Sequence, residues 1–212
     1  MKKIIQFTFI LFTTLTFSQN AKSLLDDVAE TVRSYDNIYI EFEHQFDNVE
    51  ANMHQTTKGN ATLKGDLYRF EYMGVEQLFD GYKIYLLVHE DEEVVIKAPN
   101  SEDATTLTPS RMMTFYENGF TYEMDIVQKV KGKKLQFVKL TPTNSDSELK
   151  NVLVGINVSK NQIYKVIETG KDNTITTYTI LKFKTNQSIS DSLFTFDKSA
   201  FEEKGYSISE PK

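Results

Sequence analysis

The feature that most constrains the fold is a long succession of short segments in which apolar and polar residues alternate. In residues 40–46, for example, Phe42 and Phe46 alternate with acidic and amide side chains. This period of two places the apolar residues on one face of a β-strand. Turn sequences such as Asp80-Gly81, a strong hairpin signal, separate the segments. The sequence therefore predicts ten or eleven sequential antiparallel strands.

Two segments have the period of a helix instead. In residues 21–34 the apolar positions follow the i, i+3, i+4, i+7 spacing of an amphipathic helix, and Asn20 is placed to cap its first turn. Thr108 and Pro109 have the order of an N-cap followed by a proline at the first helical position. We expect a short helix over residues 111–116 after them.

Together these patterns predict a mainly β fold. Many sequential antiparallel strands with few helices favour a strongly curved sheet, which we expect to be an incomplete, half-open barrel of about 11 strands. The concave face of such a sheet must be filled, and the short helices are the segments available to cover it. Where they do not fill it completely, an apolar cavity remains. No internal repeat and no linker divides the chain, so we expect a single domain.

The N-terminal segment has the features of an export signal. Two lysines precede an apolar run over residues 4–12, and the small residues Thr16 and Ser18 follow at the spacing of a cleavage site. We predict a secretory signal peptide over residues 1–18 and a mature domain over residues 19–212, exported to the periplasm. The alternative is a retained membrane anchor, but the run is short and rich in threonine for a stable span.

Composition excludes several functions. The chain has 24 Lys and Arg against 30 Asp and Glu, a formal net charge of −6, and no basic run of the kind that binds nucleic acid. It has no cysteine, which excludes disulfides, cysteine zinc sites and a thiol nucleophile. Its three histidines lack the spacing of metal ligands, and no nucleophile–base motif is present. We therefore expect a protein that is not an enzyme and has no metal or cofactor.

Several short motifs follow one another along the chain. They include an Asp-Gly-Lys-like hairpin, a Thr-Pro turn that opens a helix, a Leu-Thr-Pro strand end and a closing Phe-x-Phe. This ordered set, rather than any one piece, resembles the outer-membrane lipoprotein carrier family (LolA) over essentially the whole chain after residue 18. The segments that carry the resemblance are residues 24–34, 40–46, 59–64, 68–70, 80–83, 108–113, 140–142, 149–156 and 194–196.

The resemblance implies an eleven-stranded half-barrel with helices closing its mouth. It implies a periplasmic chaperone that binds the acyl chains of lipoproteins and carries them from the inner to the outer membrane. Its partners would be an inner-membrane ABC transporter of the LolCDE type and, in some bacteria, an outer-membrane acceptor of the LolB type. We expect the protein to be a monomer.

A carrier of acyl chains needs a loose apolar lining rather than specific hydrogen bonds, and Met, Phe, Tyr and Leu side chains suit this. The alternative is that the same side chains form an ordinary closed core. The residues that we predict to line the cavity alternate along the expected strands or lie in the second helix. They are Phe42, Phe46, Leu63, Phe70, Tyr72, Ile84, Leu86, Met112, Met113, Phe115, Tyr122, Met124 and Phe137.

The second helix is the expected lid of this cavity, and the resemblance implies that Thr108, Pro109, Arg111 and Met112 belong to it. The family typically has an arginine in the turn after its second strand, which helps to hold the lid closed in the empty state. Here that turn contains Lys64, which lacks the planar fork with which arginine bonds several carbonyls at once. A weaker latch through Lys64 is therefore expected.

Two other functions fit the same patterns. A half-barrel of this kind could act as a periplasmic sensor that binds lipid or lipoprotein as a signal, although no second domain accompanies it in the sequence. It could also carry another amphiphile, because acyl pockets discriminate poorly between chains.

Overall fold

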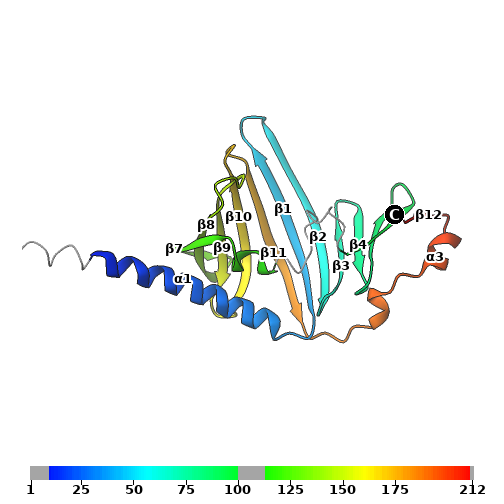
Figure 1. The fold of residues 1–212 in the computed structure, drawn as a ribbon, viewed down its shortest axis with the longest axis horizontal. Helices are drawn as coiled ribbons and strands as arrows, with labels where there is room; N and C mark the ends of the chain where they lie inside the picture. The colour runs from blue at the N-terminus through cyan, green and yellow to red at the C-terminus, as the bar shows by residue number, and fades with distance from the viewer. Residues whose placement is uncertain (1–9, 100–112, 211–212) are drawn as a thin grey trace, which may run out of the picture. The chain divides into compact units, whose positions relative to one another are not determined.

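The computed structural model describes residues 10–99 and 113–210 of the chain. In this part the protein is mainly β, with twelve strands and few helices (Figure 1). The strands are β1 (Ile38–Asn48), β2 (Met53–Lys64), β3 (Leu67–Tyr72), β4 (Val75–Phe79), β5 (Ile84–Val88), β6 (Glu93–Lys97), β7 (Phe120–Val130), β8 (Lys133–Pro142), β9 (Leu149–Asn157), β10 (Gln162–Gly170), β11 (Ile175–Thr185) and β12 (Ser207–Ser209).

The strands are hydrogen-bonded in the order β12-β6-β5-β4-β3-β2-β1-β11-β10-β9-β8-β7. Sequential strands pair antiparallel from β2 to β6 and from β7 to β11. Because β12 and β7 stand at the two ends of this order, the sheet is open and is not closed into a barrel. The predicted mainly β, open antiparallel sheet is therefore confirmed. The twelfth strand was not predicted: β12 pairs in parallel with β6, with Ser207 opposite Glu93.

The hairpin between β7 and β8 illustrates how local sequence sets the connections. Lys131 and Gly132 form its turn, with φ of 47° and 81°. Two positive φ values in a two-residue loop match the right-handed twist of the flanking strands. Glycine adopts this conformation without strain, so it stands at the second of the two positions.

The contacts along the chain divide it into two compact units. The first unit comprises residues 1–34, 45–55 and 115–179, and the second comprises residues 35–44, 56–114 and 180–212.

In the first unit, helix α1 (Ile10–Arg33) packs across β7 and β10 (Figure 1). The predicted apolar stripe faces the sheet, because Ala21, Leu25 and Val28 are at most 2 % exposed. They pack against buried side chains of the sheet such as Val138 and Val152. This cluster is the main core of the first unit.

Helix α1 begins earlier than the sequence pattern indicated. Asn20 was expected to cap its first turn, but it lies inside the helix, which runs on without a break from Ile10. Since the helix has no terminus at Asn20, no cap is needed there. No described helix of the chain is long and apolar enough to span a membrane.

In the second unit, the C-terminal segment covers one face of β4, β5 and β6. It contains η2 (Asp191–Phe194) and α3 (Lys198–Glu203), which Asp197 caps at its N-terminus. Phe194 is buried together with Leu87, Val94 and other side chains of these strands. The ring of Phe196 stacks on Tyr85 at 4.4 Å between centroids. The Phe-x-Phe motif at residues 194–196 therefore belongs to this cover.

Candidate functional site

Aromatic rings from β1 and β3 meet over β2 in the second unit. Phe42 of β1 lies 6.1 Å from Phe70 and 5.8 Å from Tyr72 of β3, measured between ring centroids. Two strands separated by a third are about 9–10 Å apart, so the rings must reach across it. They can do so because β2 places Gly59 opposite Tyr72 and Ala61 opposite Phe70. Small side chains on β2 therefore create the space in which the rings pack.

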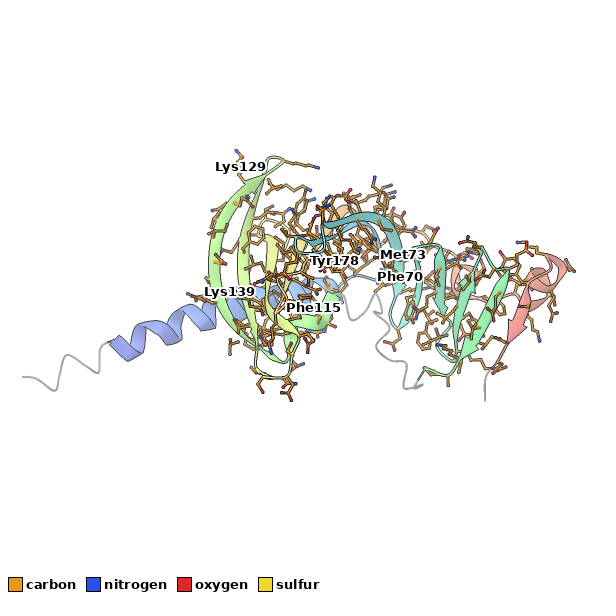
Figure 2. All side chains as sticks on the ribbon, turned by 90° about the horizontal axis from the view of Figure 1, so that it is seen from above. Phe70, Met73, Phe115, Lys129, Lys139 and Tyr178 are labelled. Atoms are coloured by element: carbon orange, nitrogen blue, oxygen red, sulfur yellow. The ribbon has the colours of Figure 1, made fainter. Side chains whose placement is uncertain are left out.

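The register of β3, β4 and β5 extends this face. Phe70 lies opposite Gln77, and Gln77 lies opposite Leu86. Because directly paired residues in an antiparallel sheet point to the same side, Leu86 shares the face of Phe70. The same relation links Tyr68, Phe79 and Ile84 along the next row. We call this surface the aromatic face and define it by Phe42, Leu63, Phe70, Tyr72, Ile84 and Leu86 (Phe70 is labelled in Figure 2).

Burial changes along the aromatic face. Phe42 is 1 % exposed and Phe70 is 7 % exposed, whereas Ile84 and Leu86 are only half-buried. On β5 the fully buried residues are Tyr85 and Leu87, which point to the opposite side, under the C-terminal segment. The second unit therefore has a closed core on one side of β5 and an apolar, partly open surface on the other.

The polar groups of the aromatic face pair with one another. The hydroxyl of Tyr72 lies 2.7 Å from Nδ1 of His44, and Gln77 donates from Nε2 to the hydroxyl of Tyr68 at 2.6 Å. Burial lowers the pKa of His44 and raises the pKa values of Tyr68 and Tyr72. These side chains are therefore uncharged near neutral pH. Such a face suits an apolar ligand.

Three of the residues predicted to line the cavity lie beneath α1 in the first unit. Phe115, Tyr122 and Met124 are partly buried against the core cluster beneath α1. Tyr122 donates its hydroxyl to the carbonyl oxygens of Tyr116 and Glu117, at 2.9 and 3.1 Å. These two bonds join β7 to η1 (Phe115–Glu117), the end of the predicted lid segment.

The structure does not bring Phe137 together with Met124. Met124 lies opposite Val138 on the helix side of β8, and side chains alternate along a strand. Phe137 therefore points to the other side, where it packs with Leu135 and Tyr164 in a separate cluster. A Cβ on Gly155 would approach the Phe137 ring to 2.8 Å, so the ring lies directly on this glycine. The alternation in the sequence already separates residues 137 and 138.

The remaining predicted residues are placed as follows. Phe46 is half-buried near the end of β1, and Met113 is buried. Thr108, Pro109, Arg111 and Met112 lie outside the described residues. The expected lid helix is seen only at its last residues, where 113 and 114 are helical and η1 follows.

Lys64, expected to act as a weak latch, forms an ion pair with Asp191 at 2.5 Å between Nζ and Oδ1. Asp191 belongs to η2, so the end of β2 is joined to the C-terminal segment. The side chain of Asp191 is 84 % exposed, and an ion pair this open to solvent contributes little to stability.

Tyr68, Gln77 and Phe79 also lie on the side of the aromatic face but were not predicted. The same period of two places Tyr68 beside Phe70, so this residue could have been found. Gln77 is polar, and only the register shows that it is buried at 3 % exposure beside Tyr68. In residues 10–99 and 113–210, no group of three or more acidic, histidine or cysteine side chains is placed to hold a metal ion.

An open antiparallel sheet with a helix against one part and an uncharged aromatic face on another is the architecture of a lipid-binding β protein. The family model described as "Outer membrane lipoprotein carrier protein LolA" matches residues 33–197. The chain therefore belongs to the LolA family. This match covers the aromatic face, β7 to β11 and η2 of the C-terminal segment, and it ends before α3.

Solved structures show the same fold at low sequence identity. An uncharacterized conserved protein from Thermus thermophilus is similar with a TM-score of 0.61 and 8 % identity, covering 91 % of this chain and 99 % of that one. LprF from Mycobacterium bovis is similar with a TM-score of 0.51 and 10 % identity, covering 82 % of this chain and 97 % of that one. The comparison with curated proteins gives no significant match.

Proposed function

We propose that this protein is a periplasmic chaperone that binds the acyl chains of lipoproteins on its aromatic face and carries them from the inner to the outer membrane. The observation that carries the proposal is the half-buried apolar surface of β5 beside the packed rings of β1 and β3. Membership of the LolA family supports a lipid as the ligand.

The energetics explain why a carrier is needed. Each CH₂ group moved out of water is worth about 0.8 kcal/mol, so one chain of about 14 to 16 carbons is worth about 11 to 13 kcal/mol. A lipoprotein therefore leaves a membrane extremely slowly unless another apolar surface accepts its chains. Ile84 and Leu86 offer such a surface without breaking the closed core on the other side of β5.

Membership of the LolA family also supports a proposal for the wider pathway. In this proposal residues 1–18 form a cleaved signal peptide, and a LolCDE-type ABC transporter of the inner membrane loads the cargo. A LolB-type acceptor at the outer membrane receives it where one is present. The segment of Thr108, Pro109, Arg111 and Met112 acts as the lid. The protein works as a monomer without a cofactor.

A release assay tests the proposal. The purified protein is added to spheroplasts of the source organism, and newly made lipoproteins are followed in the soluble fraction. Leu86→Asp places a carboxylate on the aromatic face and should abolish release. Ile175→Asp introduces the same charge at an exposed position on β11 and is the matched control.

Release that persists with Leu86→Asp would refute the aromatic face as the binding surface. No release by the folded wild-type protein, with an active transporter, would favour either a lipid-sensing regulatory protein or a carrier of another amphiphile. Binding of a fluorescent fatty acid separates these outcomes from a loss of all lipid binding.

A further inference from the structure

The tip of the β7–β8 hairpin carries a cluster of lysines that the proposed function does not use. Lys129, Lys131, Lys133 and Lys134 lie within six residues of a chain whose net charge is −6. Lys129 lies at this tip (Figure 2), directly opposite Lys134 in the register. Like charges in directly opposite positions destabilise a sheet. Neither lysine forms an ion pair within the part of the chain that the structure describes, so the repulsion is not offset there.

A hollow of about 740 Å³ lies beside this cluster in the first unit. Its volume is in the range of small-molecule sites. Its lining combines apolar side chains from two elements, Leu24 of α1 and Met124 of β7, with the lysines of two neighbouring turns. These lysines are Lys133, Lys134 and Lys160.

The register produces a gradient from charged to apolar along one side of the hairpin. The pair Lys129 and Lys134 is followed by Val127 opposite Gln136, and then by Met124 opposite Val138. At about 3.4 Å per residue, Lys134 and Val138 are about 14 Å apart along β8. The change from cations to apolar side chains therefore takes place within the length of one extended acyl chain.

Gln136 and Val127 lie between the lysine pair and the apolar pair in the register. Gln136 donates its amide Nε2 to the carbonyl oxygens of Asp125 and Phe137, at 2.8 and 2.9 Å. One of these bonds therefore reaches the segment between Met124 and Val127, where the register of the hairpin shifts. Val127 is 55 % exposed and Val158, in the neighbouring turn, is 43 % exposed. Apolar surface is left open beside the lysines.

We propose that this hollow binds a single anionic amphiphile, with its phosphate on Lys134 and Lys160 and its acyl tail against Leu24 and Met124. Lysine ammonium groups at one end of the hollow favour a phosphate, with which they form charge-assisted hydrogen bonds. The single-sided gradient favours a ligand that is charged at one end and apolar at the other. This site lies in the first unit and is independent of the aromatic face of the second.

Calorimetric titration with monomeric lipids tests the proposal. The probe is lysophosphatidylglycerol below its critical micelle concentration. It is compared with a monoacylglycerol of the same chain length, which lacks the phosphate, and with glycerol 3-phosphate, which lacks the tail. The charge-reversed variant is Lys134→Glu/Lys160→Glu, at two lysines that line the hollow. The control Lys150→Glu/Lys184→Glu changes the net charge equally at two exposed positions. Lys150 lies at the start of β9, whereas the hollow lies at the end of that strand.

The wild-type protein should bind lysophosphatidylglycerol more tightly than either partial probe. Each lysine close to an anionic lipid contributes enough that Lys134→Glu/Lys160→Glu should weaken this binding about thirtyfold. The control should bind like the wild type. Circular dichroism confirms that each variant is folded.

Three results would overturn the proposal. Equal weakening by both double variants would mean that only net charge matters. Equal affinity for glycerol 3-phosphate and lysophosphatidylglycerol would mean that no tail site exists. Binding to anionic vesicles without binding of the monomeric lipid would show that the hairpin tip docks on a membrane surface instead.

Discussion

Replacement of Gly59 by alanine should disturb the aromatic face more than any other change of one methyl group. A Cβ at this position would lie 2.5 Å from Cζ and 2.9 Å from Cε1 of Phe42, and 2.7 Å from the carbonyl oxygen of Glu71. All three separations are shorter than van der Waals contact. The Phe42 ring can turn aside, but the carbonyl belongs to β3, whose pairing with β2 holds it in place. Strand β2 must therefore shift as well.

The expected cost follows from these contacts. Forcing extra volume into a packed core costs about 1–3 kcal/mol. The smaller entropy of unfolded alanine returns about 0.4–1 kcal/mol. We expect Gly59→Ala to lower the free energy of unfolding by about 1–2 kcal/mol, which is about 2–8 °C in melting temperature for a chain of this size. Because Phe42 leaves its place against Phe70 and Tyr72, acyl-chain binding should fall as well.

Gly155→Ala provides the matched control. Its Cβ would meet only the Phe137 ring, at 2.8 Å from Cε1 and Cζ, on the face of β8 away from α1. This variant should lose stability but bind a fluorescent fatty acid normally. Chemical denaturation and fatty-acid titration of both variants make the comparison. A Gly59→Ala protein with unchanged stability and unchanged binding would refute the reasoning about how rings pack over β2.

Three further predictions concern single side chains. The Tyr116 hydroxyl is buried and has no hydrogen-bond partner among the described residues. Tyr116→Phe should therefore raise the free energy of unfolding by about 1 kcal/mol. A lower free energy of unfolding in chemical denaturation would contradict this. Burial raises the pKa of Glu168 above its ordinary value of 4.5, so the native state disfavours its charge. Glu168→Gln should therefore stabilise the protein at neutral pH, and this gain should vanish as the pH falls below 4.5; a pH-independent difference would point to another cause. The Asp197 carboxylate accepts a hydrogen bond from the Ala200 backbone at 3.1 Å. Asp197→Ala should therefore lower the free energy of unfolding by about 1 kcal/mol and speed amide exchange in α3. Asp197→Asn should leave the stability and the exchange rates unchanged.

Local pattern was sufficient where one element's own residues decide its structure. The alternation around Phe42 and Phe70 placed both rings on one side of their strands, and the apolar stripe of residues 21–34 identified the buried side of α1. The hairpin turn at Asp80-Gly81, between β4 and β5, likewise followed from its own residues. Phe137 is one residue out of step with Val138 in the sequence, and the structure places these two side chains on opposite sides of β8.

What the sequence alone determined is the class of fold and the family, since both depend on the order of strands and on short motifs within them. The tertiary structure decided which residues meet. The rings of β1 and β3 touch only because Gly59 and Ala61 fall opposite Tyr72 and Phe70, and this depends on the register between strands. The parallel pairing of β12 with β6 and the facing pair of Lys129 and Lys134 have the same origin. Register is set by packing and turn geometry together, and no single segment contains that information.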